Sequence, residues 1–511
     1  METARSRFPL SLVLDVDDEF KVLFGCLVAL SVCALFAHDN GPDLRGIPIV
    51  GPSGWFASYR GKKVFRYHAC DMVREGAERY PSGMFRVARL GWTVVVSGRQ
   101  LMDELRSAPA DELSFYYSAS EAIQTKHTLG PAAEYSRAHI HTAVVRSELT
   151  RNIATRFDDI RDEIRAAFED NVTFADGEVP AYTTVLSIVA RTSNRYFVGL
   201  PLCRNEDYLD SVCQFARTVM GSAGRIKRWP SILRPLVGHV LSPFKEHYPN
   251  LSAHIGALVA QRLREDEMPG AGKADVPNDA ITWLLKYENR EDRLEVTIMR
   301  IMIINFVATH TSTNMFTQAM FQLAAQPEYI APLRQEVEEV VARQGWTKAS
   351  MRDMHKVDSF LREVARTSKS GCISLNRRVM KEAGFTFSNG VTLPKGTYVA
   401  ASMHAAHMNP DVYPNPEIFD GFRFSRLREK DPTKYQMVST DFDYIQFGHG
   451  HHACPGRFFA ANELKAMLAH LVLHYDVQLE GGSRVKPENE WIDEFACADT
   501  KANVMFRKRV V

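Results

Sequence analysis

The chain has 511 residues, of which 45% are hydrophobic and 24% are charged, enough for one large or two ordinary domains. Its 62 basic and 61 acidic residues leave a formal net charge of +1, without the basic excess of nucleic-acid-binding proteins, so we expect no nucleic-acid partner. The 8 cysteines are scattered without paired spacing, which argues against a disulfide framework and indicates reduced thiols on the cytosolic side.

The N-terminal region contains a candidate membrane span. Residues 22–37 form an uncharged apolar run that is slightly short for a bilayer, although Lys21 can extend toward the lipid headgroups and some membranes are thinner. A cleaved signal peptide is the alternative interpretation, because Leu35 and Ala37 could precede a cleavage site. The basic residues near the run do not decide its orientation.

Strand patterns flank a long helical region. Residues 85–98 have the pattern of a strand pair, and helical patterns dominate from about residue 137 to residue 325. Prolines and glycines mark residues 266–280 as a surface loop, and residues 385–399 have the pattern of short strands. The sequence therefore predicts a mostly α-helical domain with a small β-sheet region, an α+β fold.

A long apolar helix is expected from Leu294 to Ala325. The stretch contains no Pro or Gly and is followed by Gln326-Pro327, a helix stop signal. Such a helix would be roughly 45 Å long, enough to cross a large domain. At its centre lies Ala308-Thr309-His310-Thr311-Ser312, a polar cluster that is costly in apolar surroundings unless its groups are satisfied. Its hydroxyls could bond to carbonyls of the preceding turn, or the cluster could serve a bound group.

A second helix is expected at Asp358–Arg366. Glu363 and Arg366 are three positions apart in it, so they share a helix face and can pair. Taken alone, such a pair is an ordinary solvated ion pair of small energetic value.

The most informative stretch of the chain is a turn that contains a single cysteine. It reads Phe447-Gly448-His449-Gly450-His451-His452-Ala453-Cys454-Pro455-Gly456-Arg457-Phe458-Phe459-Ala460, with a helix expected just after it. Backbone N–H groups in such a turn can point at the sulfur, stabilise a thiolate and tune a metal bound to it.

Three other interpretations of this turn compete. The three histidines and Cys454 could bind zinc, but their spacing matches no common zinc finger. Gly448-x-Gly450-x-x-Ala453 could be a dinucleotide loop, but no βαβ unit is expected around it. Cys454 could also be a buried structural thiol. Motifs elsewhere in the chain argue against all three.

The turn resembles the haem-binding loop of the cytochrome P450 family, the haem-thiolate monooxygenases, in particular the microsomal members of fungal secondary metabolism. The resemblance implies a haem that lies between the long central helix and the cysteine loop. Cys454 would be the axial ligand of the haem b iron, and Phe447 would shield its sulfur from water. Gly450 and Gly456 would let the loop pass close under the porphyrin. His452 matches a position that often contacts a haem propionate.

The resemblance also assigns roles to residues upstream of the turn. Thr311 would take the place of the family's threonine on the oxygen side of the haem. His310 would stand where an acid is usual, so proton delivery would pass through an imidazole or water. Arg378 and Arg146 would bind haem propionates, because the forked donors of arginine suit carboxylates. In addition, Glu363, Arg366 and Arg423 would form a buried structural triad behind the haem.

The implied activity is the insertion of one oxygen atom of O2 into a small lipophilic substrate. Electrons would come from NADPH through a separate flavin-containing cytochrome P450 reductase, with cytochrome b5 as a further partner. The segments Leu393–Thr397 and Asn409–Tyr413 resemble fungal members that oxidise terpenoids and steroids, which favours hydroxylation of such a compound in secondary metabolism. A haem-binding sensor or carrier without turnover is the alternative.

Four segments follow from the resemblance. They are a short N-terminal segment at 1–21, a transmembrane anchor at 22–37, a proline-containing hinge at 38–55 and a haem-thiolate monooxygenase domain at 56–511. The implied location is the endoplasmic reticulum membrane, with a single span and a cytosolic catalytic domain.

Substrate contacts are expected by position in the family, with ordinary core packing as the alternative. The expected contacts are Ser114–Glu121, Phe306, Val307, Cys372-Ile373 and Phe495-Ala496. The segment Trp229–Leu236 could dip into the membrane near a substrate entrance or could pack in the core.

Overall fold

The fold is that of a computed structural model, which describes residues 42–54, 57–131, 140–172, 176–267, 276–287 and 292–509 together with Gly25. Apart from Gly25, the predicted anchor at 22–37 lies outside the described residues, as does part of the loop predicted at 266–280.

The α-helices are α2 (Ala57–Arg79), α3 (Arg99–Ser107), α4 (Phe115–Ile123), α5 (Thr125–Thr128), α7 (Ile140–Val144), α8 (Thr150–Asn152), α9 (Phe157–Asn171), α10 (Ala181–Phe197), α11 (Glu206–Ile226), α12 (Arg234–Val240), α13 (Pro243–Glu267), α14 (Ala280–Tyr287), α15 (Arg293–Ala325), α16 (Ile330–Gln344), α17 (Lys348–Asp353), α18 (His355–Thr367), α19 (Met403–His407), α20 (Arg423–Lys430) and α21 (Arg457–His474). A π-helical turn, η1, spans Val145–Leu149, and 3-10 turns are η2 (Leu202–Arg204), η3 (Pro327–Tyr329), η4 (Gly450–His452) and η5 (Glu480–Gly482). The strands are β1 (Met84–Arg89), β2 (Gly91–Val96), β3 (Leu113–Ser114), β4 (Asp176–Pro180), β5 (Ile373–Val379), β6 (Phe385–Thr386), β7 (Thr392–Leu393), β8 (Tyr398–Ser402), β9 (Tyr475–Leu479), β10 (Glu490–Ile492), β11 (Phe495–Cys497) and β12 (Asn503–Lys508).

The largest sheet has five strands in the order β1-β2-β8-β5-β3. β1 and β2 form an antiparallel hairpin, and β2 runs parallel to β8. Side chains of β2 alternate between two cores, because successive residues of a strand point to opposite faces. Val95 packs with Phe65 of α2, while Val94 and Val96 pack with Leu101 of α3. The predicted strand pair at 85–98 is confirmed.

Part of the segment predicted as a hinge at 38–55 is docked on this sheet. The N–H of Arg86 donates to the Pro48 carbonyl at 2.8 Å, and the N–H of Val50 donates to the Arg86 carbonyl at 3.0 Å. Ile47 and Val50 are buried. Backbone bonds and apolar burial therefore fix this stretch to the edge strand β1.

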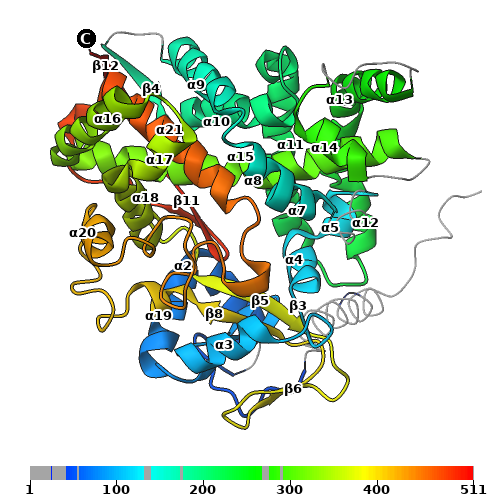
Figure 1. The fold of residues 1–511 in the computed structure, drawn as a ribbon. Helices are drawn as coiled ribbons and strands as arrows, with labels where there is room; N and C mark the ends of the chain where they lie inside the picture. The colour runs from blue at the N-terminus through cyan, green and yellow to red at the C-terminus, as the bar shows by residue number, and fades with distance from the viewer. Residues whose placement is uncertain are drawn as a thin grey trace, which may run out of the picture.

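α15 is the central helix of the fold, and it confirms the helix predicted over 294–325. It packs against α10, α11, α13, α18 and α21 and runs through the helical part of the molecule (Figure 1). Among the described helices it alone is long and apolar enough to cross a membrane, yet 67% of its apolar window is buried inside the protein. Its apolar character therefore belongs to a core helix.

Figure 1 shows the five-stranded sheet with α2, α3 and α19 at one end of the molecule and the long helices at the other. α21 enters the helical part and packs against α9, α16 and α18. The predicted mostly helical α+β fold is confirmed, and so is the helix around 358–366, which is α18.

Candidate active site

The cysteine turn has the backbone that its glycines predict. Gly448 and Gly450 have φ angles of 67° and 75°, in the left-handed region that other residues rarely adopt. The chain then makes the 3-10 turn η4 and reaches Cys454, whose N–H donates to the carbonyl of the half-buried Phe447 at 2.8 Å. α21 begins at Arg457, so the cysteine lies directly before a helix N-terminus.

Two opposing influences act on the Cys454 thiol. Burial raises its pKa, while hydrogen bonding by the backbone of Gly456 and Arg457 and the charge of the Arg457 guanidinium lower it. The lowering groups direct positive charge at the sulfur and so stabilise the thiolate. A metal cation bound to the sulfur would lower the pKa of the thiol much further and so keep it ionised. The donor set therefore suits a metal-bound thiolate.

The side chain of Arg106 leaves no room for a side chain at position 450. A Cβ at this position would lie 2.4 Å from Cγ of Arg106 in α3. At Gly456 a Cβ would meet only Cγ1 of Val145 at 3.6 Å, an ordinary contact. The prediction that both glycines make room for a porphyrin stays a prediction, and Arg106 is an additional reason for Gly450.

The zinc and dinucleotide interpretations of the turn find no support. Within the described ranges, no group of three or more His, Cys, Asp or Glu side chains is placed to hold a metal ion. His449 instead contacts the Thr440 hydroxyl at 3.0 Å and rests on the Phe442 ring. The residues just before Gly448 form turns, whereas a dinucleotide loop follows a strand.

The middle of α15 has an exposed stripe in an otherwise buried helix. Val307 is 52% exposed, Thr311 is also exposed, and Ala308 is half-buried. Val307 and Thr311 are four residues apart, so they lie on the same helix face. The Thr311 hydroxyl donates to the Val307 carbonyl at 2.8 Å, so its oxygen can still accept a hydrogen bond from water.

His310 lies next to Tyr182 of α10. Its Nδ1 lies 3.2 Å from the hydroxyl of Tyr182 in α10. Burial, helped by the charge of Arg217, lowers the pKa of His310 to about 4. Its Nε2 is buried and has no hydrogen-bond partner among the described residues. His310 is therefore neutral at neutral pH, so it can relay a proton but does not store one.

β5 carries two adjacent arginines in different surroundings. Its burial alternates, with Ile373, Leu375, Arg377 and Val379 buried and the residues between them half-buried. The guanidinium of Arg378, the predicted propionate ligand, lies 5.4 Å from the centre of the Tyr398 ring.

Arg377 has no ion-pair partner among the residues that the structure describes. Its Nη1 donates to the Asn376 carbonyl at 2.9 Å, but its Nε and Nη2 are buried without partners among the described residues. Burial lowers the pKa of Arg377 to about 10. A buried guanidinium without a counter-charge is costly, so this position calls for an anion. The alternation of Ile373, Leu375 and Val379 in the sequence was the signal that could have selected Arg377 over Arg378.

Arg377 lies close to the cysteine turn through Phe115 of α4. The Arg377 guanidinium is 5.9 Å from the centre of the Phe115 ring, and the His452 ring is 5.5 Å from it. On another side of the turn, Nη2 of the exposed Arg146 donates to the His451 carbonyl at 3.2 Å. The structure thus places Arg377 and His452 against the same ring, that of Phe115, and Arg146 supports the loop backbone.

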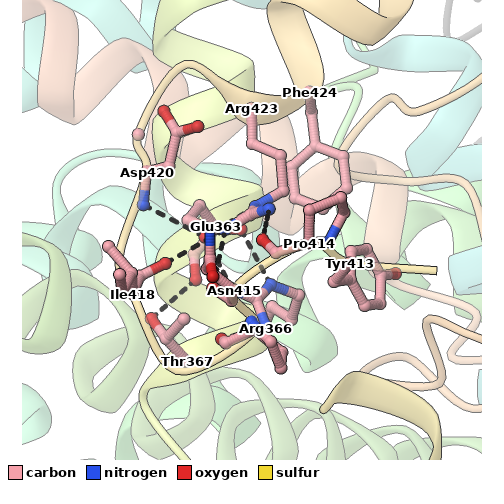
Figure 2. A network of polar contacts seen from close by, with 12 residues as sticks. Glu363, Arg366, Thr367, Tyr413, Pro414, Asn415, Ile418, Asp420, Arg423 and Phe424 are labelled. Atoms are coloured by element: carbon pink, nitrogen blue, oxygen red, sulfur yellow. Dashed lines mark hydrogen bonds and ion pairs between the residues drawn. The ribbon is translucent and has the colours of Figure 1, made fainter. Parts of the chain in front are cut away.

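The Glu363 triad exists as predicted (Figure 2). Nε and Nη2 of Arg366 donate to the two carboxylate oxygens at 2.8 and 2.6 Å, and Nε of Arg423 donates to Oε1 at 3.1 Å. Glu363 and Arg366 are completely buried, and Arg423 nearly so. Further arginine donors bind carbonyls of the segment that precedes α20, for example that of Pro416 at 2.7 Å. The network therefore fastens this segment to α18.

Comparisons with known proteins agree with this geometry. The family model of cytochrome P450 matches residues 77–506. Cytochrome P450 monooxygenase 71 of Postia placenta is 41% identical over 503 residues, which are 97% of this chain and 99% of that protein. Cytochrome P450 monooxygenase AN1598 of Emericella nidulans is 32% identical and covers 91% of this chain and 88% of its own length. The solved structure of the retinoic acid-bound cyanobacterial CYP120A1 shares the fold, with a TM-score of 0.65, 18% identity and coverage of 91% of this chain and 99% of that one.

The chain belongs to the cytochrome P450 family. It is a haem-thiolate monooxygenase, an oxidoreductase that incorporates oxygen from O2 and receives electrons from a redox partner. A sensor or carrier without turnover is not favoured, because the relatives are monooxygenases.

Proposed function

We propose that Cys454 holds the haem of this enzyme and that the enzyme hydroxylates a lipophilic, terpenoid or steroid-like compound of secondary metabolism. The observation that carries the proposal is the half-buried Cys454 thiol, which receives hydrogen bonds from the backbone of Gly456 and Arg457 at its sulfur. Bound haem b would activate dioxygen and supply the inserted oxygen atom. Phe447 packs against the main core next to the turn and would help to keep water from the sulfur.

The unpaired guanidinium of Arg377 supports the fit of a haem. A propionate would supply the anion that Arg377 lacks, with a forked geometry that suits arginine. We therefore assign this role to Arg377 in place of Arg378. His452, which shares the Phe115 contact with Arg377, would meet the same edge of the group. Arg146 would act mainly by holding the loop.

Thr311 and His310 are proposed as the residues that guide protons on the opposite side of the haem. Thr311 is exposed on α15 and keeps an acceptor free for water. Neutral His310, oriented by Tyr182, can accept a proton at one ring nitrogen and release one at the other.

Exposed apolar side chains support a lipophilic substrate. Val307, Phe495, Phe115 and Tyr117 are 52%, 44%, 38% and 37% exposed and come from α15, β11 and α4. Aromatic and aliphatic walls of this kind suit an apolar ligand. Six other expected substrate contacts are buried, which favours the alternative of ordinary packing for them. They are Ser114, Ser118, Phe306, Cys372, Ile373 and Ala496.

The electron donor is proposed to be NADPH, acting through a membrane-bound flavin reductase, with cytochrome b5 as a second donor. The location is proposed to be the endoplasmic reticulum membrane, with 22–37 as the single anchor and the domain at 56–511 in the cytosol. The apolar run at 22–37 supports this, and so does an exposed apolar patch around α12. The patch consists of Trp229 (46% exposed), Ile232 (74%), Leu236 (69%) and Val240 (76%).

The deciding experiment is a carbon monoxide difference spectrum of the reduced full-length protein in microsomes. The wild type and the control Cys70→Ala should show the strongly red-shifted Soret band of a thiolate-bound haem, and Cys454→Ala should lose it. A well-folded wild-type protein without the band, or a Cys454→Ala variant that keeps it, would overturn the assignment of Cys454. Screening of terpenoids and steroids for spectral shifts and products then tests the substrate class.

A further inference from the structure

α21 carries a buried acid that the function described so far does not use. Glu463 is 0% exposed and lies among α10, α15 and α21. No ion pair involves Glu463 in the part of the chain that the structure describes, in contrast to the buried Glu363. A buried carboxyl group without a cation favours its neutral, protonated form.

The two carboxyl oxygens of Glu463 are bound differently. Oε1 accepts a hydrogen bond from the hydroxyl of Ser193 in α10 at 2.7 Å. Oε2 is buried and makes no hydrogen bond of good geometry among the described residues, while the hydroxyl of Ser312 in α15 interacts with the same carboxyl. Burial raises the pKa of Glu463 to about 8, although both serines lower it. At neutral pH, Glu463 is therefore mostly protonated, and the Ser312 hydroxyl of α15 lies beside its carboxyl group.

The position of Ser312 connects this proton to the distal turn. Ser312 directly follows Thr311 in α15 and is 5% exposed, so the carboxyl touches the turn that carries the proposed oxygen-side threonine. Neighbouring residues of a helix point about 100° apart. A proton that leaves Ser312 must therefore pass around the helix, by way of water, to reach Thr311.

His310 cannot act as the proton donor at neutral pH, because it is not protonated there. A group with a pKa of about 4 carries almost no proton at neutral pH, and the charge of Arg217 opposes its protonation further. Of His310 and Glu463, Glu463 is thus the group that holds a transferable proton at neutral pH.

We propose that Glu463, acting through Ser312, donates a proton to the distal turn of α15 during oxygen activation. This inference rests on the proposed function of Thr311. The O–H bond of Glu463 breaks, its proton passes to Ser312 Oγ while the Ser312 proton moves on to water beside Thr311, and Glu463 becomes a carboxylate. Solvent water returns the proton before the next cycle, so the net proton source is the solvent. The electrons come from the redox partner and do not pass through Glu463.

The first test reads the proton directly and needs no turnover. Infrared spectra of the full-length protein at pH 7, in H2O and D2O, should contain a protonated carboxyl band that Glu463→Gln removes. Glu336→Gln is the matched control, since Glu336 is also an acid whose pKa is raised by burial but accepts N–H bonds from Lys356 and Val357, remote in sequence from α15. A spectrum in which Glu463→Gln removes no such band means that the carboxyl is ionised, and the proposal is wrong.

The second test measures use of the proton in the reductase-coupled enzyme with a lipophilic compound that gives a product. Glu463→Gln and Ser312→Ala should raise the hydrogen peroxide formed per NADPH consumed about 10-fold. Both variants should also show a larger solvent isotope effect, the ratio of the turnover rates in H2O and D2O. Glu463→Asp should restore part of the coupling between NADPH use and product formation. The wild-type coupling should decline as the pH rises past about 8, and Glu463→Gln should remove this step. Among the described residues, Tyr196 of α10 also interacts with Glu463, and it stays protonated over this range, because burial raises its pKa.

The experiments distinguish a failure of the Glu463 proposal from a failure of the proposed haem function. A normal thiolate-haem spectrum with unchanged coupling in Glu463→Gln would refute the role of Glu463 and leave the role of Cys454 intact. Absence of the thiolate-haem spectrum from the wild type would refute the proposed function, while the infrared band would still report the state of Glu463.

Discussion

Arg377 and Arg378 are neighbours in β5, yet they point to opposite sides of the strand. Arg377 is buried beside Phe115, with no counter-charge in the described part of the chain, whereas Arg378 lies over the Tyr398 ring. Successive side chains of a strand alternate in direction, so adjacent arginines cannot share one role. This difference offers a matched pair of variants for the haem site.

Replacement of Arg377 by Gln should weaken haem retention, and Arg378→Gln should leave it near the wild-type value. A lost partner of a buried charge costs about 2–5 kcal/mol, which corresponds to at least about a 30-fold faster loss of haem. The measurement is the rate of haem transfer to excess apomyoglobin. Equal rates for the two variants would remove Arg377 from the cofactor site.

Loss of the carboxylate of Glu363 should destabilise the fold rather than the chemistry alone. Glu363→Ala leaves two buried guanidinium groups, of Arg366 and Arg423, without their anion, which costs about 3–5 kcal/mol. Urea unfolding followed by circular dichroism measures the effect. The exposed Glu417→Ala serves as control and should shift the midpoint little. A Glu363→Ala variant as stable as the control would show that other groups compensate the charges.

Substitution of Thr311 should uncouple electron use from product formation. Thr311→Ala should bind haem normally but divert reducing equivalents to hydrogen peroxide, because water loses its hydroxyl partner on the exposed stripe of α15. We expect product formation to drop roughly 100-fold, within the range of proton-transfer catalysis. Thr311→Ser should retain most coupling. Full coupling in Thr311→Ala would exclude the residue from the proton path.

Stability should depend on pH through Glu463. Its folded-state pKa of about 8 exceeds the ordinary value of 4.5, so the folded protein holds this proton more tightly than the unfolded chain does. The associated stability is fully present below about pH 4.5 and is lost as the pH rises to about 8. This loss amounts to roughly 5 kcal/mol at about 1.4 kcal/mol per pKa unit. Thermal unfolding between pH 5 and 9 should therefore show a flatter pH dependence for Glu463→Gln than for the wild type; parallel curves would contradict it.

The exposed patch around α12 should contact lipid. In nanodiscs that contain brominated lipids, the fluorescence of Trp229 should be quenched, because Trp229 is 46% exposed beside Ile232 and Leu236. The Trp229→Phe variant should lose the quenched component. An unquenched Trp229 would mean that the patch faces water, whatever anchors the chain.

Local patterns in the sequence were sufficient for much of the fold and of the cysteine turn. The apolar run without Pro or Gly located α15, and the glycines around Cys454 predicted a turn, in which the structure gives Gly448 and Gly450 positive φ angles. The i, i+3 spacing of Glu363 and Arg366 allowed their pairing, but the third partner, Arg423, came only from the resemblance to the family.

Contacts between distant segments were beyond these patterns. Nothing local links His310 with Tyr182, or Glu463 with Ser193, since these pairs form only when α10 packs against α15 and α21. The prediction of Arg378 as a propionate ligand stays a prediction, while the strand period of Ile373, Leu375 and Val379 marks Arg377 as the buried arginine of the pair.

The close approach of Arg106 to Gly450 couples the substitutions that can be tolerated at these two positions. A side chain at 450 would collide with Arg106, so an alanine there should be tolerated better after Arg106 has become small than before. The rescue must remain incomplete, because the φ of 75° at Gly450 disfavours any side chain regardless of space. Relatives that lack the glycine at position 450 should therefore also differ at position 106. Of the two substitutions, the one that places a small residue at position 106 in α3 should have arisen first.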